Sequence, residues 1–197
     1  FVLTAPARHL IPAHPAINFS DPAGVYPVWC ISEIKGKSPN FHYNLKQLGK
    51  NSTFLEDIKA WDNLLNVIVF DDWLGNSDRN TGNLIRTGKQ RYALIDHEDI
   101  AGSRRWTEGN LNPAQDILNK LAGIVWQTSQ PSDSKQTGIM VVSAEKNMSA
   151  NISVLQELVY WWKLLLSEDE LKALHRFIMK RSTNCPERIK KRYGALI

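Results

Sequence analysis

Three polar residues in the middle of the chain have the types and the spacing that phosphoryl transfer requires. Asp78 and Asn83 lie five residues apart, and Asp96 follows Asn83 after thirteen residues. Phosphoryl transfer needs a carboxylate that orients the acceptor hydroxyl and receives its proton. It also needs oxygen ligands that hold Mg²⁺ against the nucleotide phosphates. The three residues supply such a set, with two oxygen ligands for one cation.

The surrounding sequence predicts a β-hairpin that brings these residues together. Residues 83–86 and 91–96 flank a turn at residues 87–90, whose sequence is TGKQ. Folding at this turn allows Asn83 to approach Asp96 at the end of the second strand. The spacing D-x-x-x-x-N alone is a weak signal, so a turn whose polar residues only cap their neighbours stays open as the alternative.

A long helix is expected before the loop that carries Asp78. Apolar residues recur mostly every three or four positions over residues 53–73, at Leu55, Ile58, Trp61, Leu64, Leu65, Ile68 and Val69. Thr53 and Glu56 would form a capping box at its start, and Gly75 would end it.

The chain after the hairpin is predicted to be helical. Helices are expected at residues 113–128, 154–166 and 167–179, and a mobile connection is expected at residues 130–138. Ser167 and Glu170 would form a capping box. A break at residues 184–186 would then precede a final basic helix that ends near Arg192.

The chain before residue 53 contains few signals of regular structure. Residues 25–31 (VYPVWCI) predict a short strand, and Pro27 favours an edge position for it. Residues 35–52 are polar and predict a loop. The predicted fold class is therefore mainly α with a small β component.

The residues around the loop resemble the HipA-like kinases. The resemblance covers GNSDRNTGNL at residues 75–84, LIDH at residues 94–97 and FDDW at residues 70–73. The phosphatidylinositol kinases, which also place Arg after the catalytic Asp, are a more distant resemblance. The family resemblance implies a Mg²⁺-dependent enzyme that transfers the γ-phosphate of ATP, commonly to Ser or Thr of a protein substrate.

By the same resemblance, Asp78 would be the catalytic base, and Asn83 and Asp96 would bind Mg²⁺. Residues 53–197 would form a kinase-like C-terminal lobe, helical with a catalytic β-hairpin. Residues 1–52 would form an N-terminal segment with the remnant of a small lobe, a hinge and a linker.

The sequence departs from kinase patterns in two places. Asp96 is followed by His97 rather than by Phe-Gly, and no Gly-rich loop or lysine-bearing strand precedes residue 53. We therefore expect an upstream segment or a partner polypeptide to supply the small lobe. If the N-terminal strand belongs to that lobe, a hinge that binds adenine would consist of Ser32, Glu33 and Ile34.

Arg79, next to Asp78 on the loop, and two runs of one residue type, one aromatic and one basic, are expected to have structural roles. Arg79 would fix the loop through a carboxylate or a carbonyl, with Asp71 and Asp72 as candidate partners, although exposed charges at a helix end are the default expectation for both. The aromatic run at residues 160–162 (YWW) is expected in the core. The basic run at residues 190–192 is expected at a solvated helix end.

The bulk composition limits the other classes of function. The 197 residues are 43% hydrophobic and 22% charged, which suits a folded domain. A net charge of +4 is too small to indicate direct nucleic-acid binding, and no apolar run is long enough to span a membrane. Two distant cysteines fit a cytoplasmic protein.

Alternatives to a protein kinase stay open. A lipid or small-molecule kinase would use the same three residues. A pseudokinase or regulatory binding module would explain the missing lysine. A two-metal hydrolase would use a set of aspartates: Asp71, Asp72, Asp78, Asp96 and Asp99.

Overall fold

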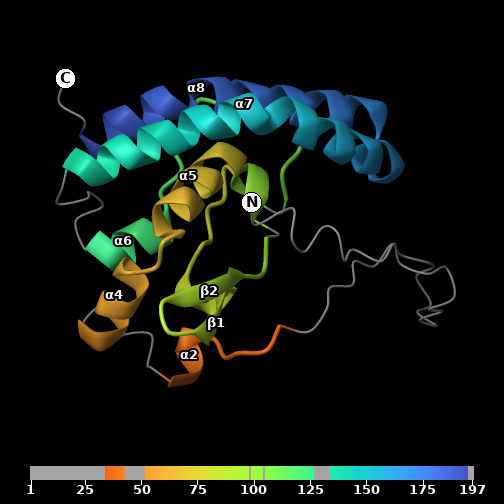
Figure 1. Ribbon diagram of the computed structural model, residues 1–197. Coiled ribbons are helices and arrows are strands. Elements are labelled where there is room, and N and C mark those ends of the chain that lie inside the picture. Colours follow the sequence, from red (N-terminus) through yellow and green to blue (C-terminus); the bar gives the residue numbers. More distant parts are fainter. Residues whose placement is uncertain (1–33, 43–51, 98, 104, 127–133, 195–197) are drawn as a thin grey trace, which may run out of the picture.

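The computed structural model describes residues 34–42, 52–97, 99–103, 105–126 and 134–194 (Figure 1). In chain order the elements are α2 (Pro39–His42), α4 (Ser52–Lys59), α5 (Leu64–Leu74), η1 (Thr81–Asn83), β1 (Leu84–Gly88), β2 (Arg91–Leu94), η2 (Ile100–Gly102), α6 (Lys120–Trp126), α7 (Ser134–Leu165) and α8 (Glu168–Tyr193). The described part is thus mainly helical with one two-stranded antiparallel sheet, and the predicted fold class is confirmed.

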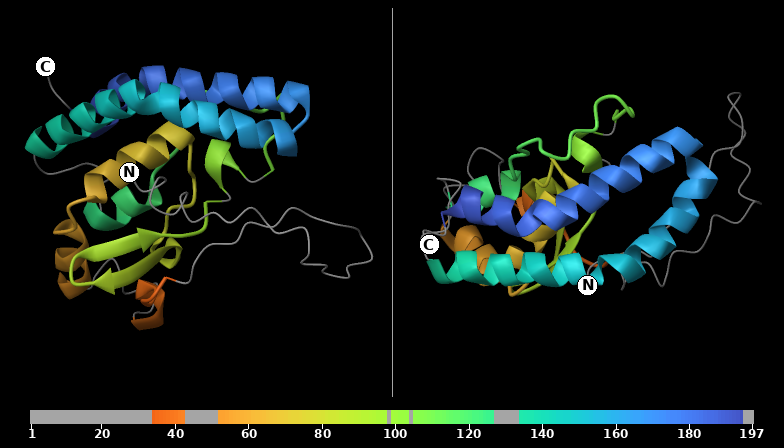
Figure 2. Two further views of the ribbon diagram at one scale, coloured as in Figure 1. Left: turned by 45° about the vertical axis from the view of Figure 1, so that its right-hand side comes forward. Right: turned by 90° about the horizontal axis from the view of Figure 1, so that it is seen from above.

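The long helices α7 and α8 lie side by side and form one layer of the molecule (Figures 1 and 2). The shorter α5 packs against both of them, and the hairpin lies on the far side of α5. Seen from above, α7 and α8 lie over α5, and the end at which they are joined extends beyond it (Figure 2, right). α5 therefore occupies the centre of the fold.

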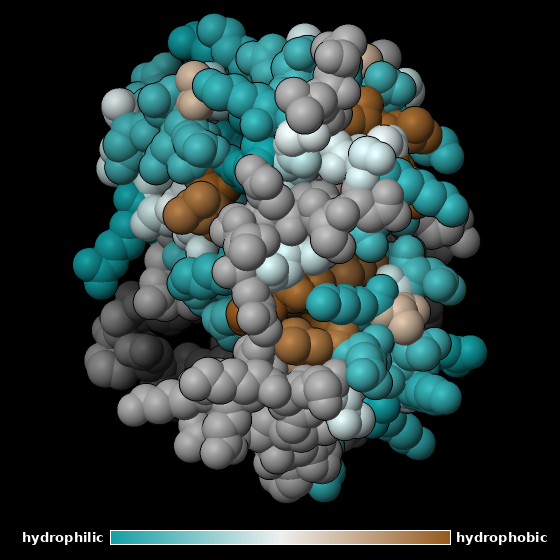
Figure 3. Space-filling view, turned by 90° about the vertical axis from the view of Figure 1, so that its left-hand side faces the viewer, coloured by the Kyte–Doolittle hydropathy of each residue, from teal (hydrophilic) through white to brown (hydrophobic). Residues whose placement is uncertain are grey.

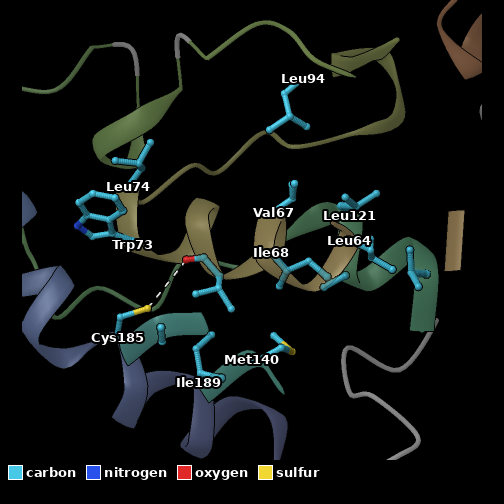
Figure 4. Close-up of a cluster of buried hydrophobic side chains, with 14 of the residues drawn as sticks. Leu64, Val67, Ile68, Trp73, Leu74, Leu94, Leu121, Met140, Cys185 and Ile189 are labelled. Carbon is cyan, nitrogen blue, oxygen red and sulfur yellow. Dashed lines mark hydrogen bonds between the residues drawn. The ribbon is translucent and has the colours of Figure 1, made fainter. Parts of the chain in front are cut away.

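Burial on nearly all sides explains the sequence of α5. Leu64, Val67, Ile68 and Val69 are each at most 4% exposed. Side chains from α5, α6, α7, α8 and β2 meet in this cluster (Figure 4). On the face shown in Figure 3, by contrast, many of the described side chains are hydrophilic and the apolar ones gather in patches between them.

The predicted continuous helix over residues 53–73 is wrong, because α4 and α5 are separate helices joined by a turn at residues 60–63. Within this turn the N–H of Trp61 donates to the carbonyl of Ile58 at 3.1 Å. Trp61 is buried, and its ring packs on Tyr92 of β2 with centroids 5.3 Å apart. Trp61, at the break between the two helices, thus anchors the hairpin. This is an effect of tertiary packing, which the spacing of apolar residues in the sequence does not reveal.

Gly75 ends α5, as the sequence predicts. Its φ of 66° lies in the left-handed region, where glycine is favoured. A Cβ at this position would also lie 3.0 Å from Ile117 and 3.1 Å from Phe177. Backbone conformation and close packing both explain the glycine.

The predicted hairpin is confirmed. Leu84 pairs with Leu94, and both side chains are buried. The backbone of Lys37 pairs with Arg86 of β1, so the segment before α2 lies against the hairpin. The expectation of an irregular loop at residues 35–52 is therefore wrong for its described part, which contains this bridge and α2.

The C-terminal helices are longer than predicted. The capping box is confirmed, since Ser167 accepts a hydrogen bond from the N–H of Glu170 and the Glu170 carboxylate accepts one from the N–H of Ser167. The predicted mobile connection is wrong from Ser134 onward, because α7 begins there. The predicted break is also wrong, since Pro186 lies inside α8. Pro186 is buried and Arg188 pairs with Asp72 of α5 at 2.7 Å, so tertiary packing holds this stretch of α8 in place.

Two further expectations on the helices need correction. The helix predicted at residues 113–128 is reduced in the described chain to α6, because the Asn112 side chain accepts from the N–H of Ala114 and favours a turn there. The aromatic run is not all core, since Tyr160 is 61% exposed and Trp161 and Trp162 are half-buried.

The predicted strand at residues 25–31 lies outside the described residues, as do Ser32 and Glu33 of the predicted hinge. Ile34 is described and half-buried, three residues before the Lys37 bridge. Within the part of the chain that the structure describes, no helix combines the length and apolar character that crossing a membrane requires.

Candidate active site

Asp78 is held in place by hydrogen bonds with asparagine side chains on its own loop. Its N–H donates to the side-chain oxygen of Asn76 at 2.9 Å. The amide nitrogen of Asn80 donates to the carbonyl and to the carboxylate of Asp78, each at 3.2 Å. Asn80 also accepts from the N–H of Gly82 at 2.7 Å. The asparagines between α5 and the hairpin thus set the conformation of the loop that presents Asp78.

The structure brings Asn83 directly to Asp78. The side-chain Nδ2 of Asn83 donates to the main-chain carbonyl of Asp78 at 2.7 Å, and Asn83 is only 7% exposed. With its nitrogen held in this way, the side-chain oxygen of Asn83 is the atom available to accept a hydrogen bond or to ligate a cation. The five-residue spacing thus places the Asn83 side chain against the Asp78 backbone, and the role of Asn83 in metal binding stays a prediction.

Asp96 lies at the same end of the hairpin. The N–H of Ile95 donates to the carbonyl of Asn83 at 3.1 Å, and Asp96 is the next residue. Asp96 is exposed and has a φ of 55°, which aspartate tolerates better than most residues. An amide oxygen and a carboxylate at one edge form a donor set of the kind that Mg²⁺ prefers, so the residues fit that ion.

Arg79 holds the loop and the hairpin together from beneath. The Arg79 side chain is fully buried and pairs with Asp71 of α5, with Nε 3.1 Å from the carboxylate. Its Nη1 donates to the carbonyl of Ile95 at 2.9 Å and, at 3.4 Å, to that of Asn83. The predicted fixing role of Arg79 is confirmed. Removing one partner of such a buried pair typically costs about 3–5 kcal/mol.

The default expectation that Asp71 and Asp72 are exposed is wrong. Both are buried, because α5 lies in the centre of the fold and each carboxylate is bound by arginine. Burial raises the pKa of Asp71, and the neighbouring Arg79, Asn76 and Asn119 act in the opposite direction.

His97 accepts a hydrogen bond at the other side of Arg79. Its Nδ1 lies 2.8 Å from Nη2 of Arg79, which can only donate. Burial, together with the nearby guanidinium, lowers the pKa of His97 to about 4. His97 is therefore neutral near pH 7 and acts as part of the scaffold under the loop.

A cation that the sequence did not indicate contacts Asp78. The ammonium of Lys120, the first residue of α6, forms an ion pair with the Asp78 carboxylate. The Lys120 hydrogen bond holds the pKa of Asp78 below its usual range. Lys120 stands 42 residues after Asp78, inside a predicted helix, so local patterns contain no signal for this contact.

Other contacts connect the loop to its surroundings. Thr81 donates to the side chain of Asn40 in α2 at 2.7 Å, and Ser38 donates to the carbonyl of Thr81 at 3.2 Å.

A separate cavity of about 510 Å³ lies between α4 and the turn end of the hairpin. Its lining includes Asp57, Arg86 and Tyr92, and the three residues of the predicted active site are not part of it.

The basic run at residues 190–192 is not wholly a solvated helix end. Arg192 pairs with Asp72 at 3.3 Å, and its side chain is 12% exposed. Arg181 and Arg188, also on α8, bind the same aspartate. This run therefore contributes to the attachment of α8 to α5.

Comparisons of the chain with protein-family models, with curated proteins and with solved structures found no match. The class of protein is therefore inferred from the residues of the site and from their geometry.

Proposed function

We propose that the chain is the catalytic C-terminal lobe of an ATP- and Mg²⁺-dependent phosphotransferase, a HipA-like kinase that acts on Ser or Thr of proteins. The observation that carries the proposal is the hydrogen bond from the Asn83 side chain to the Asp78 backbone, with Asp96 at the same end of the hairpin. This arrangement supports the proposed roles of Asp78 as the base and of Asn83 and Asp96 as the metal ligands.

Asp78 has the protonation state that the reaction needs. Its lowered pKa keeps the carboxylate ionised near pH 7, and its side chain is 33% exposed, so an acceptor hydroxyl can reach it. The acceptor oxygen forms a bond to the γ-phosphorus, the bond from that phosphorus to the bridging oxygen breaks, and ADP leaves with the electron pair. The hydroxyl proton goes to the Asp78 carboxylate.

The remaining residues hold the substrates. Bound Mg²⁺ would neutralise charge on the phosphates, and the oxygen atoms of Asn83 and Asp96 would hold it. The segment that begins at Ile34 and pairs with β1 through Lys37 runs along the hairpin, which supports the hinge hypothesis.

A pseudokinase or regulatory nucleotide-binding module is the second candidate. It is favoured by the sequence of residues 1–52, which contains no Gly-rich phosphate-loop motif. A lipid or small-molecule kinase would share the three site residues with a protein kinase. A two-metal hydrolase is disfavoured, because the carboxylates of Asp71 and Asp72 are already bound by arginines.

Incubation with Mg²⁺-ATP and a dephosphorylated protein acceptor, in the presence of the upstream segment or partner polypeptide that supplies the small lobe, tests the proposal, with phosphate transfer followed by mass spectrometry. We expect Asp78→Asn to abolish transfer and to change nucleotide affinity only a few-fold, because Asp78 orients the hydroxyl rather than the nucleotide. Asp62→Asn, at an exposed turn, is the matched control and should retain transfer. Full turnover by the Asp78 variant would refute the assignment, whereas nucleotide binding without transfer by the wild type would favour the pseudokinase.

A further inference from the structure

Lys120 is placed beside Asp78 by the start of α6. Asn119, the preceding residue, accepts from the N–H of Ala122 at 2.8 Å and is 8% exposed. Leu121, the next residue, is fully buried in the cluster that contains Leu64 of α5 (Figure 4), so the backbone on both sides of Lys120 is held by the core. The contact between Lys120 and Asp78 therefore arises from a fixed backbone position and not only from a long side chain on the surface.

The pair of Lys120 and Asp78 is open to solvent. The Lys120 side chain is 54% exposed and that of Asp78 is 33% exposed. An ammonium group has three donor hydrogens, and a single carboxylate oxygen takes one of them. Lys120 can therefore bind a second anion while it stays next to Asp78.

Arg79, although close in sequence, cannot meet a substrate. It is fully buried, and its nitrogens are engaged by Asp71, by two carbonyls and by His97. Of the described cations, Lys120 is the one whose charged group contacts Asp78 directly. The anionic charge of a transferring phosphoryl group is spread over its three outer oxygens and needs donors beyond one metal site.

We propose that Lys120 is a catalytic residue that donates a hydrogen bond to the γ-phosphoryl group of the nucleotide while Asp78 receives the proton of the acceptor. The inference rests on the proposed phosphotransferase function and adds to it a phosphate-binding cation on α6. Lys120 takes no part in the proton transfer, so the movement of the proton to Asp78 and of the electron pair to ADP is unchanged. The lysine screens the γ-phosphate charge from the carboxylate as the two approach.

Affinities for two nucleotides distinguish this role from a structural one. Titration calorimetry with Mg²⁺ would compare a non-hydrolysable ATP analogue with ADP, which lacks the γ-phosphate. We expect Lys120→Met to weaken the analogue roughly tenfold, the scale of a lost hydrogen bond between charged groups, and to leave ADP within about twofold. Lys120→Arg should retain most of the analogue affinity, and Lys146→Met, at an exposed site on α7, should change neither.

An unchanged preference for the ATP analogue in Lys120→Met, or an equal loss for both nucleotides, would overturn the role of Lys120 alone. Failure of the wild-type protein to bind either nucleotide would overturn the proposed function and this inference together.

Discussion

At the scale of single residues, the site is specified by hydrogen bonds that span few positions. The Asn80 side chain bonds to Asp78 and Gly82, each two residues away, and Asn83 bonds to Asp78 over five. Contacts of such short range follow from the local sequence, and this explains why the positions of Asp78 and Asn83 could be predicted. Lys120 and the clamp between Arg79 and Asp71 depend on how separate elements pack.

The two proposed metal ligands should differ in strength. We expect Asp96→Ala to weaken Mg²⁺-dependent ATP binding by roughly tenfold or more and Asn83→Ala by less, because a carboxylate neutralises charge and an amide only completes the coordination shell. Calorimetric titration of both variants with ATP and Mg²⁺ measures this difference. Asp62→Ala serves as control, and equal affinity in the wild type and both variants would contradict the assignment.

At the scale of elements, local signals predicted the hairpin, the end of α5 and the start of α8. Each of these depends on residues close in sequence: the TGKQ turn, Gly75, and the pair of Ser167 and Glu170. The errors fall where distant contacts override local preference. At Trp61 the helix is interrupted although the apolar spacing is regular, and the Trp61 ring packs on the hairpin. At Pro186, α8 continues although proline normally ends a helix.

Asp57 of α4 is the residue that attaches the hairpin from the side. Its carboxylate accepts two bonds from Arg86 at 3.0 Å, one from the Tyr92 hydroxyl at 2.6 Å and one from the N–H of Gln90 at 3.1 Å. Burial alone would raise the pKa of Asp57, but the bonds from Arg86 and Tyr92 outweigh it and hold the pKa below its ordinary value.

Asp57→Asn should therefore lower the free energy of unfolding at neutral pH, by about 1–3 kcal/mol. A pKa that is lower in the folded than in the unfolded state gives stability above the unfolded value, and this stability is lost as the pH falls through the folded value. Denaturant unfolding at several pH values should thus show the gap between wild type and variant closing in acid. If the difference in unfolding free energy between wild type and variant stays constant below pH 4, the ionised carboxylate of Asp57 is not what stabilises the hairpin.

At the scale of the whole molecule, two adjacent residues of α5 connect the long helices to the catalytic loop. Asp71 binds Arg79 beneath the loop, and Asp72 binds three arginines of α8. Neighbouring positions on a helix point in different directions. The central helix α5 thus joins the α7–α8 layer on one side to the loop that presents Asp78 on the other. The position of this loop therefore depends on the ion pairs of Asp71 and Asp72.

Asp72→Asn should therefore destabilise the fold strongly. The Asp72 side chain is 2% exposed, and Arg181, Arg188 and Arg192 would keep their charges in a largely buried place after its loss. We expect the free energy of unfolding in denaturant to fall by about 3–5 kcal/mol. Adding Arg188→Gln to this variant should recover part of the loss, because it removes one uncompensated charge. Asp62→Asn should stay within about 0.5 kcal/mol of the wild type, and a comparably small change for Asp72→Asn would show that apolar packing alone holds α8 on α5.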